Sequence, residues 1–101
     1  MTRPAFPEPL DHLPLRGRGD AVALVLKDRV LDYAELEDWT GRLAAWLSAR
    51  ASAEGWEKGA RVASWSGKGL LTCLMPLAAP RAGLVHVPVN PVLKAAQVRH
   101  I

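Results

Sequence analysis

The sequence predicts an α/β fold in which a β-hairpin and a helix precede a parallel βαβ unit. Short apolar runs bounded by turn residues alternate with two longer helical patterns along the chain. A helix-capping signal stands at Asp32, and Gly83 follows the second helical pattern as a stop. Because a strand, a crossover helix and a second strand follow one another at this spacing, we expect a parallel, right-handed unit.

Residues 1–20 are expected to form an irregular lead-in. Prolines interrupt this stretch, and Gly17 and Gly19 close it. A chain of 101 residues is long enough for one domain with a modest core. Residues 21–101 are therefore expected to belong to one domain.

Residues 21–31 are expected to form the hairpin. The continuous apolar run of residues 21–26 suits a buried strand, and residues 29–31 suit a second short strand. Lys27-Asp28 is expected to form the turn between them, although it lacks the favoured Asn-Gly or Asp-Gly pair.

The first helix is expected to begin at Asp32, to run to about Ala51 and to end in the loop around Gly55. Asp32 and Glu35 form an Asp-based version of the capping box, which satisfies free N–H groups at a helix start. Apolar residues recur at spacings of three and four on one helical face: Leu36, Trp39, Leu43, Trp46 and Leu47. A stripe with two tryptophans can bind a partner, but at this spacing we interpret it as core.

The βαβ unit is expected over the remaining chain. We expect a strand at residues 61–65, a loop at 66–69 and an apolar helix at 70–82. A second strand at 84–89 and a final helix at 92–101 should follow. Asn90-Pro91 is expected to form the turn before the last helix.

The apolar stretch of residues 69–93 contains one charge, Arg81, and could be mistaken for a membrane span. Inserting Arg81 near its middle would cost about 2.5–3.5 kcal/mol, and several prolines interrupt the stretch. We therefore expect no transmembrane helix. Because Pro76 and Pro80 fall inside the expected helix, it should form two short pieces or one bent helix.

The charge pattern argues against a nucleic-acid partner. The 13 basic and 10 acidic residues give a net charge of +3 and are mixed along the chain, as where Asp28 lies between Lys27 and Arg29. A nucleic-acid surface gathers basic residues on one face and adds aromatic side chains for stacking. We interpret the charges as a solvated surface.

Cys73 is the only cysteine, which excludes an internal disulfide and a cysteine-based zinc site. It lies in an apolar run, where a free cysteine usually behaves as a small buried hydrophobe. The proline-rich start of the chain has no apolar segment of a secretory signal. Both observations indicate a cytoplasmic protein.

No motif in the sequence predicts an active site. The loop Ser66-Gly67-Lys68-Gly69 lacks the spacing of a Walker loop and the third glycine of a dinucleotide fingerprint. His12, His86 and His100 stand too far apart for metal-ligand spacing. We assign no catalytic, cofactor-binding or metal-binding residue.

The pattern as a whole resembles the start of the AMP-dependent synthetases, the adenylate-forming family of acyl-CoA synthetases, luciferases and adenylation domains. The resemblance covers about four fifths of the chain and rests on residues 32–36 (DYAEL), 41–47 (GRLAAWL), 58–63 (KGARVA) and 81–91 (RAGLVHVPVNP). The end of the sequence is similar to an acyl-CoA ligase subgroup associated with exosortase systems. Pro80 and Ala60 depart from the family's usual residues.

The resemblance implies an AMP-forming acyl-CoA ligase, which converts a carboxylic acid and ATP into an acyl-adenylate and then a CoA thioester. Full-length members would use ATP, Mg²⁺ and CoA. The motifs that bind phosphate, adenine and ribose in the family are absent here, as is its C-terminal lysine. Residues 21–101 would then be an incomplete N-terminal domain without activity of its own.

A different interpretation stays open. The chain can be a free-standing small α/β module whose tryptophan-bearing helix and apolar C-terminal half pair with a protein partner or with a second copy.

Overall fold

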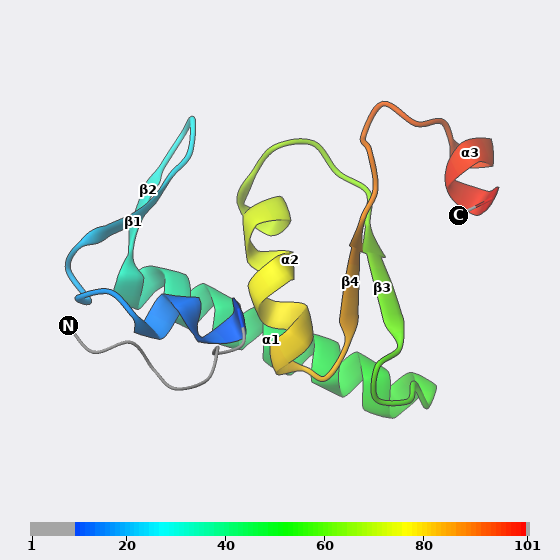
Figure 1. Ribbon diagram of the computed structural model, residues 1–101, viewed down its shortest axis with the longest axis horizontal. Helices are drawn as coiled ribbons and strands as arrows, with labels where there is room; N and C mark the ends of the chain where they lie inside the picture. The colour runs from blue at the N-terminus through cyan, green and yellow to red at the C-terminus, as the bar shows by residue number, and fades with distance from the viewer. Residues whose placement is uncertain (1–9, 101) are drawn as a thin grey trace.

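The computed structural model describes residues 10–100 and shows the α/β order that the sequence predicts. A hairpin and a long helix precede a βαβ unit and a short last helix (Figure 1). The elements are η1 Leu10–Leu15, β1 Val22–Val25, β2 Val30–Asp32, α1 Tyr33–Glu54, β3 Arg61–Ser64, α2 Leu70–Arg81, β4 Val85–Pro88 and α3 Ala95–His100.

The lead-in, expected to be irregular, contains one helical element at residues 10–15, and residues 16–20 are irregular as expected. Leu10–Leu15 form a 3-10 helix, η1, which packs against α1 and α2 and buries Pro14. Short 3-10 turns are frequent connectors and leave little periodic signal in a sequence. Gly17 passes so close to Tyr33 that an added Cβ would overlap the ring. The prediction for residues 1–9 lies outside the described residues.

The hairpin forms at the predicted residues, but the prediction of a buried first strand is wrong, because no residue of Val22–Val25 is buried and both valines are more than half exposed. β1 and β2 pair antiparallel around Lys27-Asp28, with a register shift between Val22 and Leu24. The backbone N–H of Leu26 donates to the carbonyl of Arg29 at 2.8 Å and closes the turn.

The capping box at the start of α1 is confirmed in both directions. The carboxylate of Asp32 accepts from the backbone N–H of Glu35 at 2.8 Å, and Glu35 Oε1 accepts from the backbone N–H of Asp32 at 3.2 Å. The helix ends at Glu54, three residues beyond the expected end, and Gly55 adopts the left-handed conformation with φ 71°. Glycine reaches this conformation without the steric cost of a Cβ.

The βαβ unit is parallel, as expected. β3 and β4 pair in register from Arg61 with Val85 to Ser64 with Pro88, and α2 connects them. Gly83, at φ 77°, carries the chain from α2 into β4. The last helix, α3, begins at Ala95 instead of residue 92, because Asn90 to Leu93 form a turn closed by a 3.1 Å backbone hydrogen bond.

Both prolines of α2 lie inside one continuous helix, so the alternative of two separate pieces is excluded. An interior proline costs about 3 kcal/mol in an isolated helix. Packing offsets this cost, because α2 contacts α1, η1 and β4, and its residues Ala78 and Ala79 are fully buried. Among the helices of residues 10–100, none combines the length and the apolar composition that a bilayer span requires.

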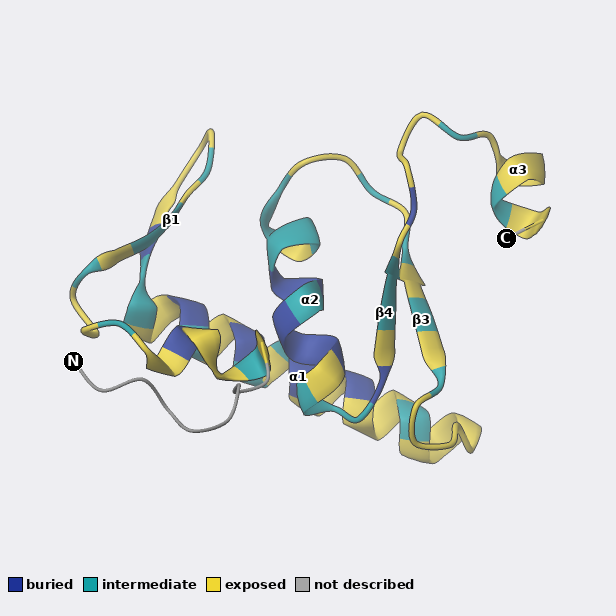
Figure 2. Ribbon diagram, in the orientation of Figure 1, coloured by how far each residue is buried: buried dark blue, intermediate teal, exposed yellow. Residues whose placement is uncertain are grey.

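The core lies where α1 and α2 meet (Figure 2). It consists of two neighbouring groups of buried side chains: Ala44, Leu47, Met75, Ala78, Ala79 and Leu84, and Leu36, Leu74 and Leu77. The hairpin tip and α3 are mainly exposed in the same view.

The interpretation of the tryptophan stripe as core is wrong for its two tryptophans. Trp39 is 38% exposed and Trp46 is 59% exposed. The face of α1 that α2 buries contains Leu36, Thr40, Ala44 and Leu47. Trp39 and Trp46 each precede a residue of this face by one position. Because each residue turns the helix by about 100°, the two tryptophans lie at the edge of the buried face.

Candidate functional site

The loop of residues 66–69 connects β3 to α2 and is held by Thr72. The Thr72 hydroxyl donates to the carbonyl of Gly67 at 2.7 Å and lies 3.1 Å from the hydroxyl of Ser66. Gly69 caps α2 without any side-chain hydrogen bond. This geometry is that of a connecting turn, in line with the sequence interpretation.

The three histidines lie on different elements. His12 belongs to η1 and lies 3.5 Å from Asp11, His86 is in β4, and His100 is in α3. Within residues 10–100, no three His, Cys, Asp or Glu side chains come close enough together to hold a metal ion.

The structure reveals a pair that sequence reasoning missed. The Ser64 hydroxyl and His86 Nε2 share a 2.7 Å hydrogen bond between β3 and β4. His86 pairs in register with Val62, and Ser64 lies two residues further along β3, so both side chains lie on the same face of the sheet. The strand register, which a single sequence does not reveal, was the missing signal.

Burial lowers the pKa of His86, because desolvation penalises the charged imidazolium. A neutral imidazole can donate or accept at Nε2 according to its tautomer. The pair connects two strands, and the third group that would orient a catalytic histidine is not seen beside it within residues 10–100.

Cys73 is less buried than expected. It is partly exposed and lines an apolar hollow of about 240 Å³ beneath η1, together with Leu10, Leu13, Leu24 and Leu77. No histidine lines this hollow among residues 10–100. Cys73 thus has no neighbouring base there to activate its thiol.

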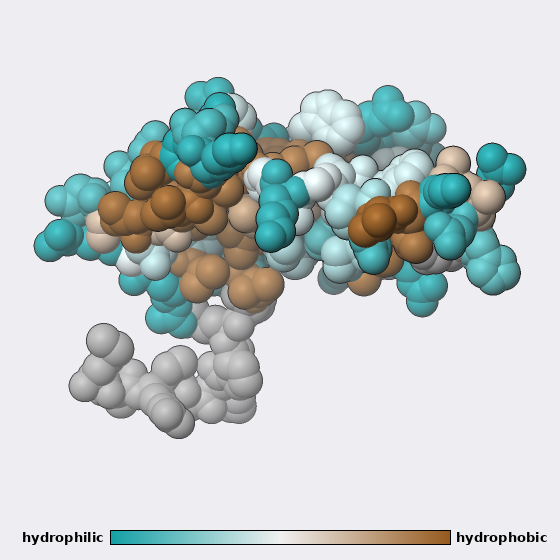
Figure 3. All heavy atoms as spheres, turned by 90° about the horizontal axis from the view of Figure 1, so that it is seen from above, coloured by the Kyte–Doolittle hydropathy of each residue, from teal (hydrophilic) through white to brown (hydrophobic). Residues whose placement is uncertain are grey.

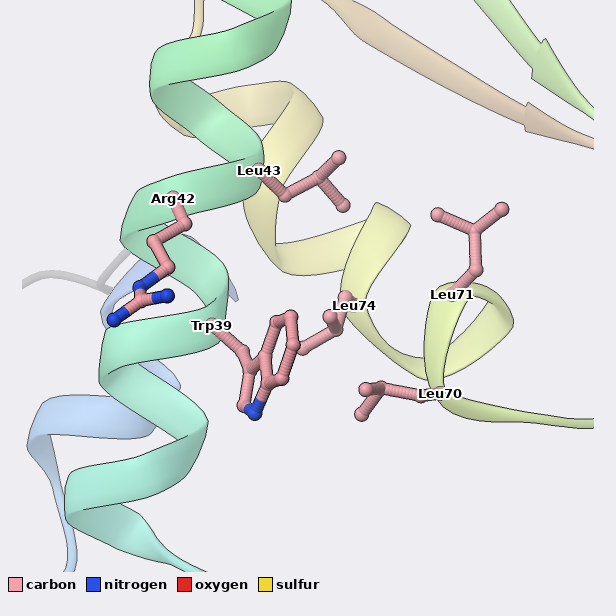
Figure 4. A pocket seen from close by; sticks show the side chains of 6 residues that line it. All are labelled: Trp39, Arg42, Leu43, Leu70, Leu71 and Leu74. Carbon is pink, nitrogen blue, oxygen red and sulfur yellow. The ribbon is translucent and has the colours of Figure 1, made fainter.

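An open apolar surface lies along α1. A groove of about 420 Å³ between α1 and the start of α2 is lined by Trp39, Arg42, Leu43, Leu70, Leu71 and Leu74. Figure 4 shows the indole of Trp39 directed toward Leu74, with the guanidinium of Arg42 on the opposite side of Trp39. Leu71 is itself half-exposed.

A second groove of about 340 Å³ continues from the first, since both are lined by Leu43 and Leu71. It reaches β3 and gathers the other three tryptophans, Trp46, Trp56 and Trp65. We call these two hollows the tryptophan grooves. Arg42 and Arg50 are the only charged residues that line them, and no acidic side chain does so within the described residues.

A second exposed apolar surface lies on the hairpin. Val22, Val25 and Val30 are each more than half exposed. Figure 3 shows apolar side chains gathered at the hairpin end of the molecule, apart from a smaller group toward the other end. The apolar surface is thus distributed over several elements.

Arg81 joins three elements at the end of α2. Its guanidinium makes two hydrogen bonds of 2.9 Å to the carboxylate of Glu37 in α1. It also donates to the backbone carbonyl of Asp11 in η1 at 2.6 Å. Such a bidentate pair fixes the relative positions of its elements.

Comparison with known protein families gives one finding. The sequence model of the AMP-binding enzyme family matches residues 14–101, which include every helix and strand from β1 to α3. No curated protein matches the chain. Because the match extends over most of the sequence, the chain belongs to the AMP-binding enzyme family.

Proposed function

We propose that this chain is the N-terminal scaffold segment of an AMP-forming acyl-CoA ligase. In the parent reaction, a carboxylate attacks ATP and releases pyrophosphate, and the CoA thiol then displaces AMP from the acyl-adenylate. The segment contributes folded framework to this enzyme and is not expected to catalyse either step alone. Its proposed partner is the remainder of the ligase.

The observation that carries the proposal is the open parallel pair β3–β4. Parallel sheets normally have several strands and helices on both faces. In residues 10–100, the sheet has two strands and each has one neighbour. A further hollow of about 270 Å³ lies beside the two strands and is lined by Arg61, Ala63, Val87 and Val89. From the rest of the described chain, only Val98 of α3 lines it. Further strands and helices of a ligase domain would cover these surfaces.

The loop of residues 66–69 does not fit ATP and Mg²⁺, which full-length family members use. A triphosphate site needs backbone N–H groups, cations and a Mg²⁺ ligand around the phosphates. The loop of residues 66–69 offers one cation, Lys68, and its Gly67 carbonyl is bonded to Thr72. No catalytic step is therefore assigned to this chain.

The finer assignments belong to the same proposal. The CoA acceptor and the carboxylic acid substrate come from the resemblance to acyl-CoA synthetases, because the motifs of residues 32–36 and 81–91 are shared by the whole family and do not specify an acceptor or an acid. The exosortase-associated subgroup rests only on the end of the sequence. A cytoplasmic location agrees with the lone thiol.

Complementation tests the proposal directly. An acyl-CoA synthetase that lacks the segment matching residues 14–101 should be inactive, and adding this chain should restore ATP–pyrophosphate exchange. The chain alone should show none. The coding DNA downstream should also encode a Ser/Thr/Gly-rich loop with a lysine. Unrelated downstream sequence together with failed complementation would contradict the proposal.

A second candidate is a small interaction module, which the exposed tryptophans favour. This candidate predicts a chain that unfolds cooperatively by itself and has a defined oligomeric state. Aggregation or a molten state of the isolated chain would argue for the scaffold segment instead.

A further inference from the structure

One face of α1 carries both an exposed aromatic side chain, at the border of the smaller tryptophan groove, and the larger groove. Trp46 is the most exposed of the four tryptophans, at 59%. One helical turn or two toward the N-terminus, Trp39, Arg42 and Leu43 border the larger tryptophan groove. A surface that holds both an exposed aromatic side chain and a groove can be complementary to a second copy of itself across a two-fold axis.

The concave shape indicates a protein partner. Apolar side chains that enter a bilayer interface protrude from the surface as a continuous apolar face. Here Leu43, Leu70 and Leu74 line the floor of a groove. Grooves of this kind receive the apolar face of a helix.

The positions of Trp46 and the groove define one antiparallel register. For Trp46 of each copy to lie opposite Arg42 and Leu43 of the other, the two-fold axis must pass α1 at the level of Ala44. A residue that precedes Ala44 by a given number of positions then faces the residue of the partner copy that follows Ala44 by the same number. Because α1 has 22 residues, the pair would extend along most of the helix.

Charge supports this same register. It places Asp38 of each copy opposite Arg50 of the other, so two opposite-charge pairs form by symmetry. Arg42 then lies opposite Trp46, where a cation–π contact is possible. Glu35 and Glu54 lie opposite alanines, so no like charges meet.

The present partners of these side chains are easily exchanged. Asp38 pairs with Arg42 at 3.1 Å, and Arg50 pairs with Glu54 at 3.5 Å. All four side chains are about half exposed or more. Exposed pairs of this kind contribute little to stability, so rearranging them for a partner copy costs little.

We infer that the isolated chain forms a two-fold dimer through antiparallel α1 helices, with Trp46 of each copy in the larger tryptophan groove of the other. This inference does not rest on the scaffold role, and it specifies the oligomeric state that the interaction-module candidate predicts. The dimer covers the face of α1 and leaves the open edges of β3 and β4 free.

Sedimentation equilibrium of the full chain and its variants tests the inference. The unchanged chain should be dimeric, and Trp46→Glu should be monomeric. Asp38→Arg alone and Arg50→Asp alone should each weaken the dimer at least about tenfold, since each creates two like-charge pairs. The double variant D38R/R50D restores opposite charges and should dimerise again. Val92→Gln, at an 81% exposed position outside α1, is the control and should leave the dimer unchanged.

Far-UV circular dichroism of each variant separates loss of pairing from loss of folding. Rescue by the double variant supports the register, because an unfolded single variant would not be rescued by a second change. A monomeric unchanged chain, or a dimer that Trp46→Glu does not affect, would overturn the inference. So would a chain that floats with anionic phosphatidylserine vesicles and stays monomeric without them.

Discussion

The contact between α1 and α2 buries its apolar side chains, whereas the pair of strands β3 and β4 keeps open edges and exposed apolar side chains. The helices bury a contiguous set of apolar side chains between them, and Arg81 and Glu37 close one end with an ion pair. Among the described residues each of these strands has one neighbour, and Val85 is half exposed. Helices satisfy their own backbone hydrogen bonds, whereas a strand depends on neighbours on both sides. Stability should therefore reside mainly in the helical contact.

A deletion in the helical contact should have the largest effect. Leu47 is almost fully buried between the helices, and Leu47→Ala should lower the free energy of unfolding by about 2–5 kcal/mol, through lost transfer energy and a cavity. Urea unfolding followed by tryptophan fluorescence measures this change. The matched variant in the open sheet, Val85→Ala, should cost much less. Equal losses would break the comparison.

Removing one partner of the Arg81 ion pair should have the next largest effect. Glu37→Ala leaves the partly buried guanidinium with only the Asp11 carbonyl among its three hydrogen bonds. We expect a loss of about 1–3 kcal/mol in the free energy of unfolding. Glu54→Ala breaks an exposed pair of the same helix, the one with Arg50, and should cost less than about 1 kcal/mol. Thermal unfolding of both variants would show whether burial makes this difference.

The cap of α1 should contribute less. Asp32→Ala removes the carboxylate that accepts from Glu35 and should cost about 1 kcal/mol. Asp32→Asn keeps an acceptor and should retain most of the stability. If the two variants are equally destabilised in urea, the cap does not stabilise α1 as described.

The smallest expected effect is a pH dependence of stability that arises from His86 in the open sheet. Because the pKa of His86 is lowered in the folded chain, the unfolded chain binds this proton more readily. The contribution of neutral His86 to the free energy of unfolding is complete above the ordinary histidine pKa of about 6.5, where neither state binds this proton. It is lost as the pH falls toward the lower pKa of the folded chain. Urea midpoints measured at descending pH should therefore decrease. In His86→Gln this part of the decrease should disappear, and an unchanged pH profile would contradict the assignment.

Sequence reasoning identified the elements whose signals are local. The capping pair Asp32 and Glu35, the stop at Gly83 and the apolar strand patterns depend on neighbouring residues, and each lies where expected. η1 was missed because its order comes from packing against α1 and α2.

The surface was less predictable than the fold. Helical spacing groups Trp39 and Trp46 with Leu36 and Leu47, and only the position of α2 decides which of them it covers. The Ser64–His86 hydrogen bond required the strand register. The tryptophan grooves likewise arise from two elements that meet in space.

The hydrogen bond from Arg81 to the Asp11 carbonyl has a consequence for the order of folding. It joins residues 70 positions apart, whereas the hairpin and α1 form from neighbours in sequence. Closing a longer loop costs more chain entropy, which increases with the logarithm of its length. Docking of η1 is therefore expected to be the last step of folding and the first to reverse. Amide hydrogens of η1 should exchange with solvent before those at the centre of α1.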